Sequence, residues 1–162
     1  MDRRTLVAGL IMGGGGARTT NAAEPQSVSP VIAAFAQALS AHDIGAFAAL
    51  FADDYINHQT SAAVPPSAAG LSAKQASVAF FAARLKGLPD LSVAIEASLA
   101  NGDMAAASFV YTGTHQGVYF GVAPTGKSLR FTSCDIFRVR NGKIAEHWGM
   151  GDIAGILAQL KA

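Results

Sequence analysis

The sequence predicts an α+β fold in which helices cover one face of an antiparallel sheet. Two observations lead to this prediction. Apolar residues recur at helical spacing up to residue 87, and after Pro89 they change to the two-residue alternation of strands. One more helical pattern follows the strands, beginning at Asp152. Because helices and strands occupy separate parts of the chain, the sheet is expected to be antiparallel rather than interleaved with crossover helices.

Three helices are predicted before the sheet, and each begins with residues typical of a helix N-terminus. The first is expected over residues 29–42 and opens with a Ser-Pro pair, and the second, shorter one begins at Asp43. The third is expected over residues 72–87, where Ser72 and Gln75 have the spacing of a capping box. The helical part of the chain therefore ends where the strand pattern begins.

Four long strands are expected, joined in part by tight turns. Asn101-Gly102 and Asn141-Gly142 are Asn-Gly pairs, which are typical of hairpin turns. A shorter strand over residues 53–58 and a proline-containing loop over 61–70 separate the second and third helices. The long strands are expected over residues 91–99, 104–115, 128–140 and 143–150.

Composition limits the class of partner. The chain has 162 residues, 51% of them hydrophobic and 14% charged, which is typical of one globular domain and excludes a disordered chain. The formal net charge is +1 and there is no run of lysine or arginine, so a nucleic acid or an anionic membrane surface is not expected as a partner. Cys134 is the only cysteine, which excludes an internal disulfide. A small, weakly charged molecule is the expected partner.

Residues 1–23 have the pattern of an export signal. Arg3 and Arg4 precede an apolar, glycine-rich run, and small residues follow up to Ala23. The arginine pair resembles the twin-arginine type of signal. The run has 13 residues, too few to span a bilayer as a helix. We therefore expect an exported protein, periplasmic or secreted, whose mature domain covers residues 24–162 and begins near Glu24.

Residues 121–128 match the phosphate-loop pattern G-x-x-x-x-G-K-S in every position. A phosphate loop requires a helix that begins at its Lys-Ser pair, because the helix N-terminus binds the phosphate. Here the residues that follow are rich in aromatic and β-branched types and show no helical period. We therefore interpret the segment as a connection between strands and reject nucleotide hydrolysis.

Asp135 is the strongest candidate for chemistry. In the strand over residues 128–140 it lies on the face that carries Leu129, Phe131 and Phe137, whereas arginines mark the opposite face as solvent-facing. Burial disfavours the charged form of a carboxyl group, and this property suits a residue that transfers protons. The alternative is that strand twist brings Asp135 to solvent.

The turn at Asn141-Gly142 decides which residue lies opposite Asp135. A two-residue turn pairs Arg140 with Lys143 and places Asp135 opposite Trp148. A three-residue turn with a glycine bulge shifts the register by one and places Asp135 opposite His147. We favour the bulged register, because it turns Lys143, Ala145, His147 and Gly149 inward, where the small residues leave a cavity. This register makes an Asp–His pair, in which the histidine can exchange a proton near neutral pH.

Further polar and aromatic residues could contact a ligand. His58 ends the short strand, where it could cover a cavity, and His115 follows a strand end, where it could line the mouth or only cap a turn. The histidines lack the spacing of a metal site, so no metal is expected. The candidate catalytic residues are Asp135 and His147, and the candidate ligand-binding residues are Tyr55, Asn57, His58, His115, Phe137 and Trp148.

Three spaced motifs resemble one protein family. They are YTGTHQG from residue 111, GVAPTGK from residue 121 and DIFRVRNGKIAEHW from residue 135. Together they are similar to a SnoaL-like polyketide cyclase (ester cyclase) domain of the nuclear transport factor 2-like superfamily. The resemblance covers residues 30–161. It implies a cone formed by a curved sheet and three helices around a pocket, and homo-oligomers, commonly dimers.

The resemblance also implies a reaction without cofactor or metal. In this family a base removes a proton next to a carbonyl, and the enolate closes a ring by aldol attack. Asn57, Asp135 and His147 fall at pocket positions of the family pattern, and a small apolar or polyketide-like carbonyl compound is the implied ligand. Characterised cyclases carry an acid-base aspartate where this chain has Gly149. Gly149 leaves a second interpretation open, an exported binding protein without catalysis, and a third is a protein that binds a partner through the outer face around Ile136 and Trp148.

Overall fold

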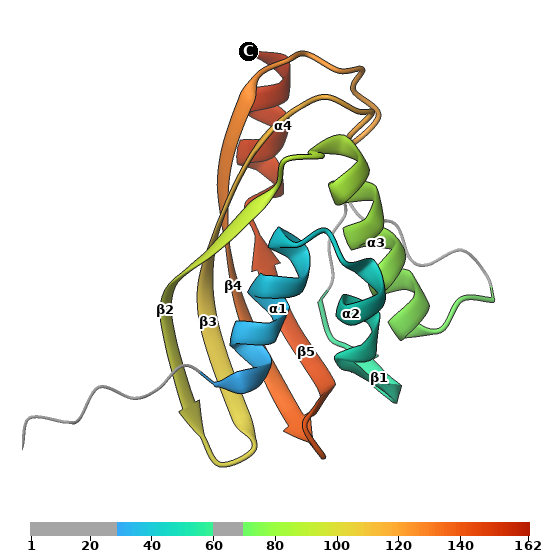
Figure 1. Ribbon diagram of the computed structural model, residues 1–162, viewed down its shortest axis with the longest axis vertical. Coiled ribbons are helices and arrows are strands. Elements are labelled where there is room, and N and C mark those ends of the chain that lie inside the picture. Colours follow the sequence, from blue (N-terminus) through green and yellow to red (C-terminus); the bar gives the residue numbers. More distant parts are fainter. Residues whose placement is uncertain (1–28, 60–69) are drawn as a thin grey trace, which may run out of the picture.

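In the computed structural model, which describes residues 29–59 and 70–162, five strands form one curved sheet (Figure 1). The strand order is β1-β5-β4-β3-β2, and β2 to β5 are antiparallel, as predicted. The predicted export signal and residues 61–69 of the predicted loop lie outside the described residues. The strands are β1 (Phe51–Asn57), β2 (Ser92–Asn101), β3 (Met104–Thr114), β4 (Ser128–Arg140) and β5 (Lys143–Gly151).

The short strand β1 occupies the edge of the sheet beside β5, and it runs parallel to β5. Its pairing brings Asn57 level with His147, although the two residues are far apart in the sequence. The sequence predicted this strand but not its partner. The parallel pairing matters for the site, because it brings the side chains of β1 next to those of β5.

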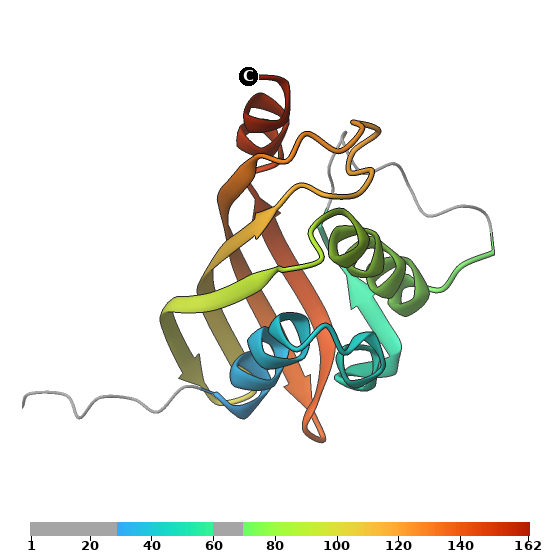
Figure 2. The ribbon, with the colours of Figure 1, turned by 45° about the horizontal axis from the view of Figure 1, so that its top comes forward.

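Helices α1 (Pro30–Ser40), α2 (Ile44–Ala49) and α3 (Ala73–Gly87) lie on the concave side of the sheet (Figure 2). Helix α4 (Ile153–Lys161) lies beside the first residues of β4. The predicted capping box of α3 is present, with Ser72 accepting from the Gln75 amide and Gln75 accepting from the Ser72 amide. The predicted order of three helices, sheet and terminal helix is confirmed. Within the described residues, no helix has the length and apolar character needed to cross a membrane.

The core between the helices and the sheet is built mainly of aromatic side chains. Phe35 of α1 lies at its centre, with ring centroids of four other phenylalanines within 5.5 Å. These rings come from α2, α3, β3 and β4, so the contacts join all layers of the fold. The four partners of Phe35 are Phe47, Phe81, Phe109 and Phe137.

Two connections test the predicted turns. The β2–β3 hairpin pairs Asn101 with Met104, so its two turn residues are Gly102 and Asp103, one residue later than predicted. Gly102 has a φ of 59°, which glycine adopts without strain. Strand β4 begins directly at Ser128, with no helix after the GVAPTGK motif. This strand confirms that the motif is not a phosphate loop.

Candidate active site

Asp135 and His147 lie together on the inner face of the sheet. Asp135 is 6% exposed and His147 is 5% exposed. The His147 Nε2 atom lies 2.7 Å from Asp135 Oδ1, within hydrogen-bond distance. The alternation predicted for β4 is present, with Leu129, Phe131, Asp135 and Phe137 buried on one face. The alternative in which strand twist exposes Asp135 is therefore excluded.

The register that produces this pair differs from both predicted alternatives. The turn has two residues, Asn141 and Gly142, both with positive φ, and it pairs Arg140 with Lys143. The bulged three-residue turn that the sequence favoured is therefore wrong. A β-bulge lies farther from the turn instead, where Val139 pairs with Ile144 but Arg138 pairs with Glu146.

Ala145 is the extra residue of this bulge, and it changes which side chains of β5 face inward. Ile144 and Ala145 are both buried, whereas Lys143 is exposed, contrary to the prediction that Lys143 faces inward. An unbroken alternation from Ile144 would point His147 away from the helices, because the side-chain period of a strand is two. The bulge restores the inward position of His147.

Gly149 lies directly opposite Asp135 in the sheet, and His147 is the next inward residue of β5. A Cβ atom at position 149 would lie 2.5 Å from Asp135 Oδ1 and 2.5 Å from His147 Nε2. The hydrogen bond between the two side chains therefore occupies the space above Gly149. In this chain, the absence of a side chain at position 149 permits the carboxylate of β4 to reach the histidine.

The second oxygen of Asp135 is held by Ser133. The Ser133 hydroxyl lies 2.5 Å from Asp135 Oδ2 and 3.3 Å from the hydroxyl of Tyr111. A carboxylate only accepts hydrogen bonds, so the single hydroxyl proton of Ser133 is donated to Asp135. The hydroxyl of Tyr111 then donates to Ser133. Asp135 thus accepts one hydrogen bond on each oxygen, from His147 and from Ser133.

The other ring nitrogen of His147 contacts Tyr55. The Tyr55 hydroxyl lies 3.2 Å from His147 Nδ1, and the Ser77 hydroxyl donates to Tyr55 over 3.4 Å. Burial raises the pKa of Tyr55 to about 12, so the phenol keeps its proton at neutral pH. The carboxylate of Asp135 only accepts hydrogen bonds, so the nitrogen that faces it, Nε2, is the donor of the neutral ring, and Nδ1 accepts from Tyr55. His147 then carries its own proton on Nε2 and donates to Asp135.

Asn57 ends this polar chain at the edge of the sheet. Its Nδ2 atom donates to Ser77 over 3.4 Å, while the rest of the residue is exposed. Phe137 lies on the apolar side of the pair, with its ring stacked on His147 at a centroid distance of 5.0 Å. The structure therefore places Tyr55, Asn57 and Phe137 with the pair, and a continuous series of donors leads from exposed Asn57 to buried Asp135.

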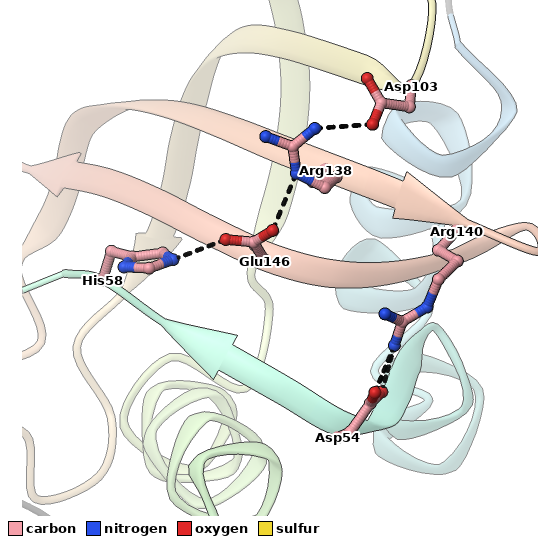
Figure 3. A network of polar contacts seen from close by, with 6 residues as sticks. All are labelled: Asp54, His58, Asp103, Arg138, Arg140 and Glu146. Carbon is pink, nitrogen blue, oxygen red and sulfur yellow. Dashed lines mark hydrogen bonds and ion pairs between the residues drawn. The ribbon is translucent and has the colours of Figure 1, made fainter.

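His58 and Trp148 lie on the outer face of the sheet, away from His147. Their rings stack at a centroid distance of 4.4 Å, and His58 Nε2 lies 2.8 Å from Glu146. Figure 3 shows that Glu146 also accepts from Arg138, which in turn pairs with Asp103. Contact of Trp148 with a ligand stays a prediction. The structure places both side chains on the opposite side of the sheet from the Asp135–His147 pair, whose cavity His58 was expected to cover. The reason is the period of two in β5, which turns Glu146 and Trp148 outward when His147 points inward.

The outer network predicts a pH dependence of stability. The hydrogen bond from His58, with that from Arg138, lowers the pKa of Glu146 below its ordinary value. A lowered carboxyl pKa stabilises the folded state above the unfolded pKa, and this stabilisation is lost as the pH falls. We expect Glu146→Gln to lose less stability than the wild type between about pH 5 and pH 3. Urea unfolding at both pH values measures this difference, and equal losses would contradict the prediction.

His115 is fully buried and organises a loop instead of lining an opening. Its backbone N–H donates to Lys127, its carbonyl accepts from Gly126, and its Nδ1 atom accepts from the Thr125 amide over 3.2 Å. It therefore joins the two ends of the connection between β3 and β4. Of the two roles open to it from the sequence, the structure shows the contacts of a turn cap.

Several residues at the site were not predicted. Ser133 was visible as a second polar residue on the inner face of β4, two positions before Asp135. Ser77 on α3 and Tyr111 on β3 gave no signal, since a serine in a helix and a tyrosine in a strand are both common. Within residues 29–59 and 70–162, no three His, Cys, Asp or Glu side chains are grouped so that they could hold a metal ion.

Solved structures with the same fold include proteins of three different descriptions. IdmH from Streptomyces antibioticus, a proposed polyketide cyclase, is 28% identical, with 82% of this chain and 96% of that chain covered and a TM-score of 0.69. AclR from Streptomyces galilaeus, a proposed hydroxylase, is 24% identical over 81% and 78% of the two chains, with a TM-score of 0.68.

A protein from Catenulispora acidiphila with a ketosteroid isomerase-like fold, in complex with trimethylamine, is 20% identical. The similarity covers 83% of this chain and 95% of that chain, with a TM-score of 0.63. The latter two likenesses show the fold alone. A search of curated proteins finds no match. The family model of the SnoaL-like polyketide cyclases matches residues 30–160, which is most of the chain. This protein therefore belongs to the SnoaL-like polyketide cyclase family.

Proposed function

We propose that this protein is a cofactor-independent enzyme that closes a ring in a small apolar carbonyl compound by acid-base chemistry. The observation that carries the proposal is the buried Asp135–His147 hydrogen bond, with Ser133 and Tyr55 completing it on either side. Family membership supports a cyclase type of reaction. The ligand would approach the pair on the inner side of the sheet, where Leu129, Phe131 and Phe137 of β4 supply apolar side chains.

Asp135 is the proposed base. Both ring nitrogens of His147 are engaged, Nε2 by Asp135 and Nδ1 by Tyr55. Each oxygen of Asp135 accepts one hydrogen bond and keeps a second lone pair. The carboxylate can therefore take a proton from a ligand carbon while His147 and Ser133 hold its orientation. His147 and Tyr55 are positioning residues in this proposal.

The proposed reaction balances without an added reagent. A C–H bond next to a ligand carbonyl breaks, its proton goes to the carboxylate of Asp135, and its electron pair forms an enolate. The enolate carbon attacks a second carbonyl of the same molecule, which forms the ring C–C bond and an alkoxide. The alkoxide takes the proton back from Asp135. The enzyme ends in its starting protonation state.

Proton abstraction can be tested without the natural ligand. 2-Tetralone, a bicyclic ketone, exchanges its carbon-bound protons next to the carbonyl for deuterium in D2O, and proton NMR follows the loss of signal. We expect the wild-type protein to accelerate this exchange at least tenfold over buffer of the same pH, as a positioned base does. Exchange at the buffer rate would contradict the proposal.

A second measurement distinguishes the proposed enzyme from a binding protein without catalysis. Native mass spectrometry of the protein purified from its own host would detect a retained small molecule. A bound ligand together with exchange at the buffer rate would favour the binding function, for which the missing aspartate at position 149 is the supporting observation. Accelerated exchange that Asp135→Asn removes would favour the enzyme.

A further inference from the structure

Arg84 is a buried cation on the face of α3 that packs toward the sheet. The residue is 4% exposed. Among the described residues, no carboxylate lies within ion-pair distance of it, whereas Arg138 and Arg140 on the sheet each pair with aspartate. A buried charge without a counter-charge strongly destabilises the folded state. The position of Arg84 therefore requires a compensating group.

Aromatic rings supply part of this compensation. The Arg84 Cζ atom lies between 4.8 and 5.1 Å from the centroids of four rings, and electron-rich ring faces attract a guanidinium. Arg84 Nε donates to the hydroxyl of Tyr119 over 3.0 Å. A guanidinium has five N–H donors, and those of its two terminal nitrogens form a planar fork that matches a carboxylate. The four rings belong to Phe80, Phe81, Tyr111 and Phe131.

This cation is connected to the candidate active site through Tyr111. Arg84 Cζ lies 4.8 Å from the centre of the Tyr111 ring. The hydroxyl of the same tyrosine contacts Ser133, which donates to Asp135. A group bound to Arg84 would therefore lie on the inner side of the sheet, close to the proposed base. Within the described residues, two side chains, Tyr111 and Ser133, connect Arg84 to Asp135 through consecutive contacts.

We propose that Arg84, with the hydroxyl of Tyr119, binds an oxyanion of the ligand, and that the surrounding rings contact a flat conjugated carbon skeleton. The ligand class is a planar, mostly apolar aromatic or conjugated carbonyl compound that carries one acid group. The inference rests on the proposed function for its statement that this ligand is the substrate, but the binding site itself does not depend on catalysis. Recognition by charge would orient the carbonyl group of such a ligand relative to Asp135.

A matched pair of probes separates charge from shape. 2-Naphthoate carries a carboxylate, and 2-naphthamide has nearly the same shape without the charge. By calorimetry, we expect the wild type to bind naphthoate at least tenfold more tightly than naphthamide. Arg84→Met keeps an unbranched side chain without the charge and should reduce this ratio to about one, whereas Arg84→Lys should retain part of it. Equal binding of both probes, or the same preference in Arg84→Met, would overturn the proposal and leave Arg84 stabilised by the rings alone.

A second measurement needs no variant, so it remains decisive if Arg84→Met does not fold. In the wild-type protein labelled with 15N, the Nε–H resonance of Arg84 should shift during titration with naphthoate and stay unchanged with naphthamide. The absence of a shift would overturn the proposal. Neither probe undergoes the proposed reaction. Naphthoate binding without accelerated tetralone exchange would therefore support the oxyanion site and contradict the proposed function. Accelerated tetralone exchange without naphthoate binding would support the proposed function and contradict the oxyanion site.

Discussion

Asp135→Asn is expected to lower the rate of catalysed proton exchange by about a hundredfold to ten-thousandfold, the usual contribution of a positioned general base. Asparagine has the shape of aspartate, so its carbonyl oxygen can still accept from His147. Its amide nitrogen can donate to Ser133, whose hydroxyl accepts as well as donates. The neutral amide cannot take a proton from carbon. The variant should therefore fold as the wild type does and lose only the chemistry.

The deuterium exchange of 2-tetralone measures this effect. Asp54→Asn is a matched control, since it removes the same charge from an exposed residue that pairs with Arg140 on the outside of the sheet. The control should keep the wild-type exchange rate. Thermal unfolding should confirm that both variants are folded. Wild-type exchange by Asp135→Asn, or an equal loss in Asp54→Asn, would remove Asp135 from the proposed mechanism.

Gly149→Asp alone is expected to inactivate the protein. Removing Asp135 as well is expected to restore part of the activity. A Cβ at position 149 would lie 2.5 Å from both Asp135 Oδ1 and His147 Nε2, so the two side chains would have to move apart. Gly149→Asp therefore breaks their hydrogen bond and adds a second carboxylate. We expect exchange to fall about a hundredfold or more. The free energy of unfolding should fall by about 1 to 3 kcal/mol, the cost of unpaired buried groups.

The double variant Gly149→Asp with Asp135→Gly moves the carboxylate from β4 to β5. The new position is the one at which the family resemblance implies the acid-base residue. Exchange by the double variant should exceed that of Asp135→Gly alone by at least tenfold, and urea unfolding should show that it is more stable than Gly149→Asp. Full activity in Gly149→Asp would show that the two positions do not compete. A double variant no faster than Asp135→Gly would show that a carboxylate on β5 cannot replace Asp135.

The local features of the fold were predictable from the sequence because they depend on neighbouring residues. The capping box of Ser72 and Gln75 and the alternation of β4 are both present as predicted. The rejection of the phosphate loop is confirmed because strand-forming residues follow Ser128. In each case, neighbouring residues of the same segment decide the local conformation.

The pairing at the site was not predictable in the same way. The Asn-Gly pair at residue 141 indicated a tight turn, and a two-residue turn is present. The irregularity that turns His147 inward lies instead at Ala145, where both Ile144 and Ala145 are buried. No turn-forming or bulge-forming residue type marks Ala145 in the sequence. The extra residue is stabilised by burial against the core, which is a property of the folded molecule.

The sequence by itself therefore determined the order of the elements, the inner face of β4 and the presence of a carboxylate among apolar side chains. Only the tertiary structure decided which groups contact that carboxylate. His147, Tyr111 and Tyr55 reach the network from three other strands, and Arg84 contacts Tyr111 from a helix. Contacts between such distant residues depend on register and on packing across layers, and neither is encoded in the spacing of residues along one segment.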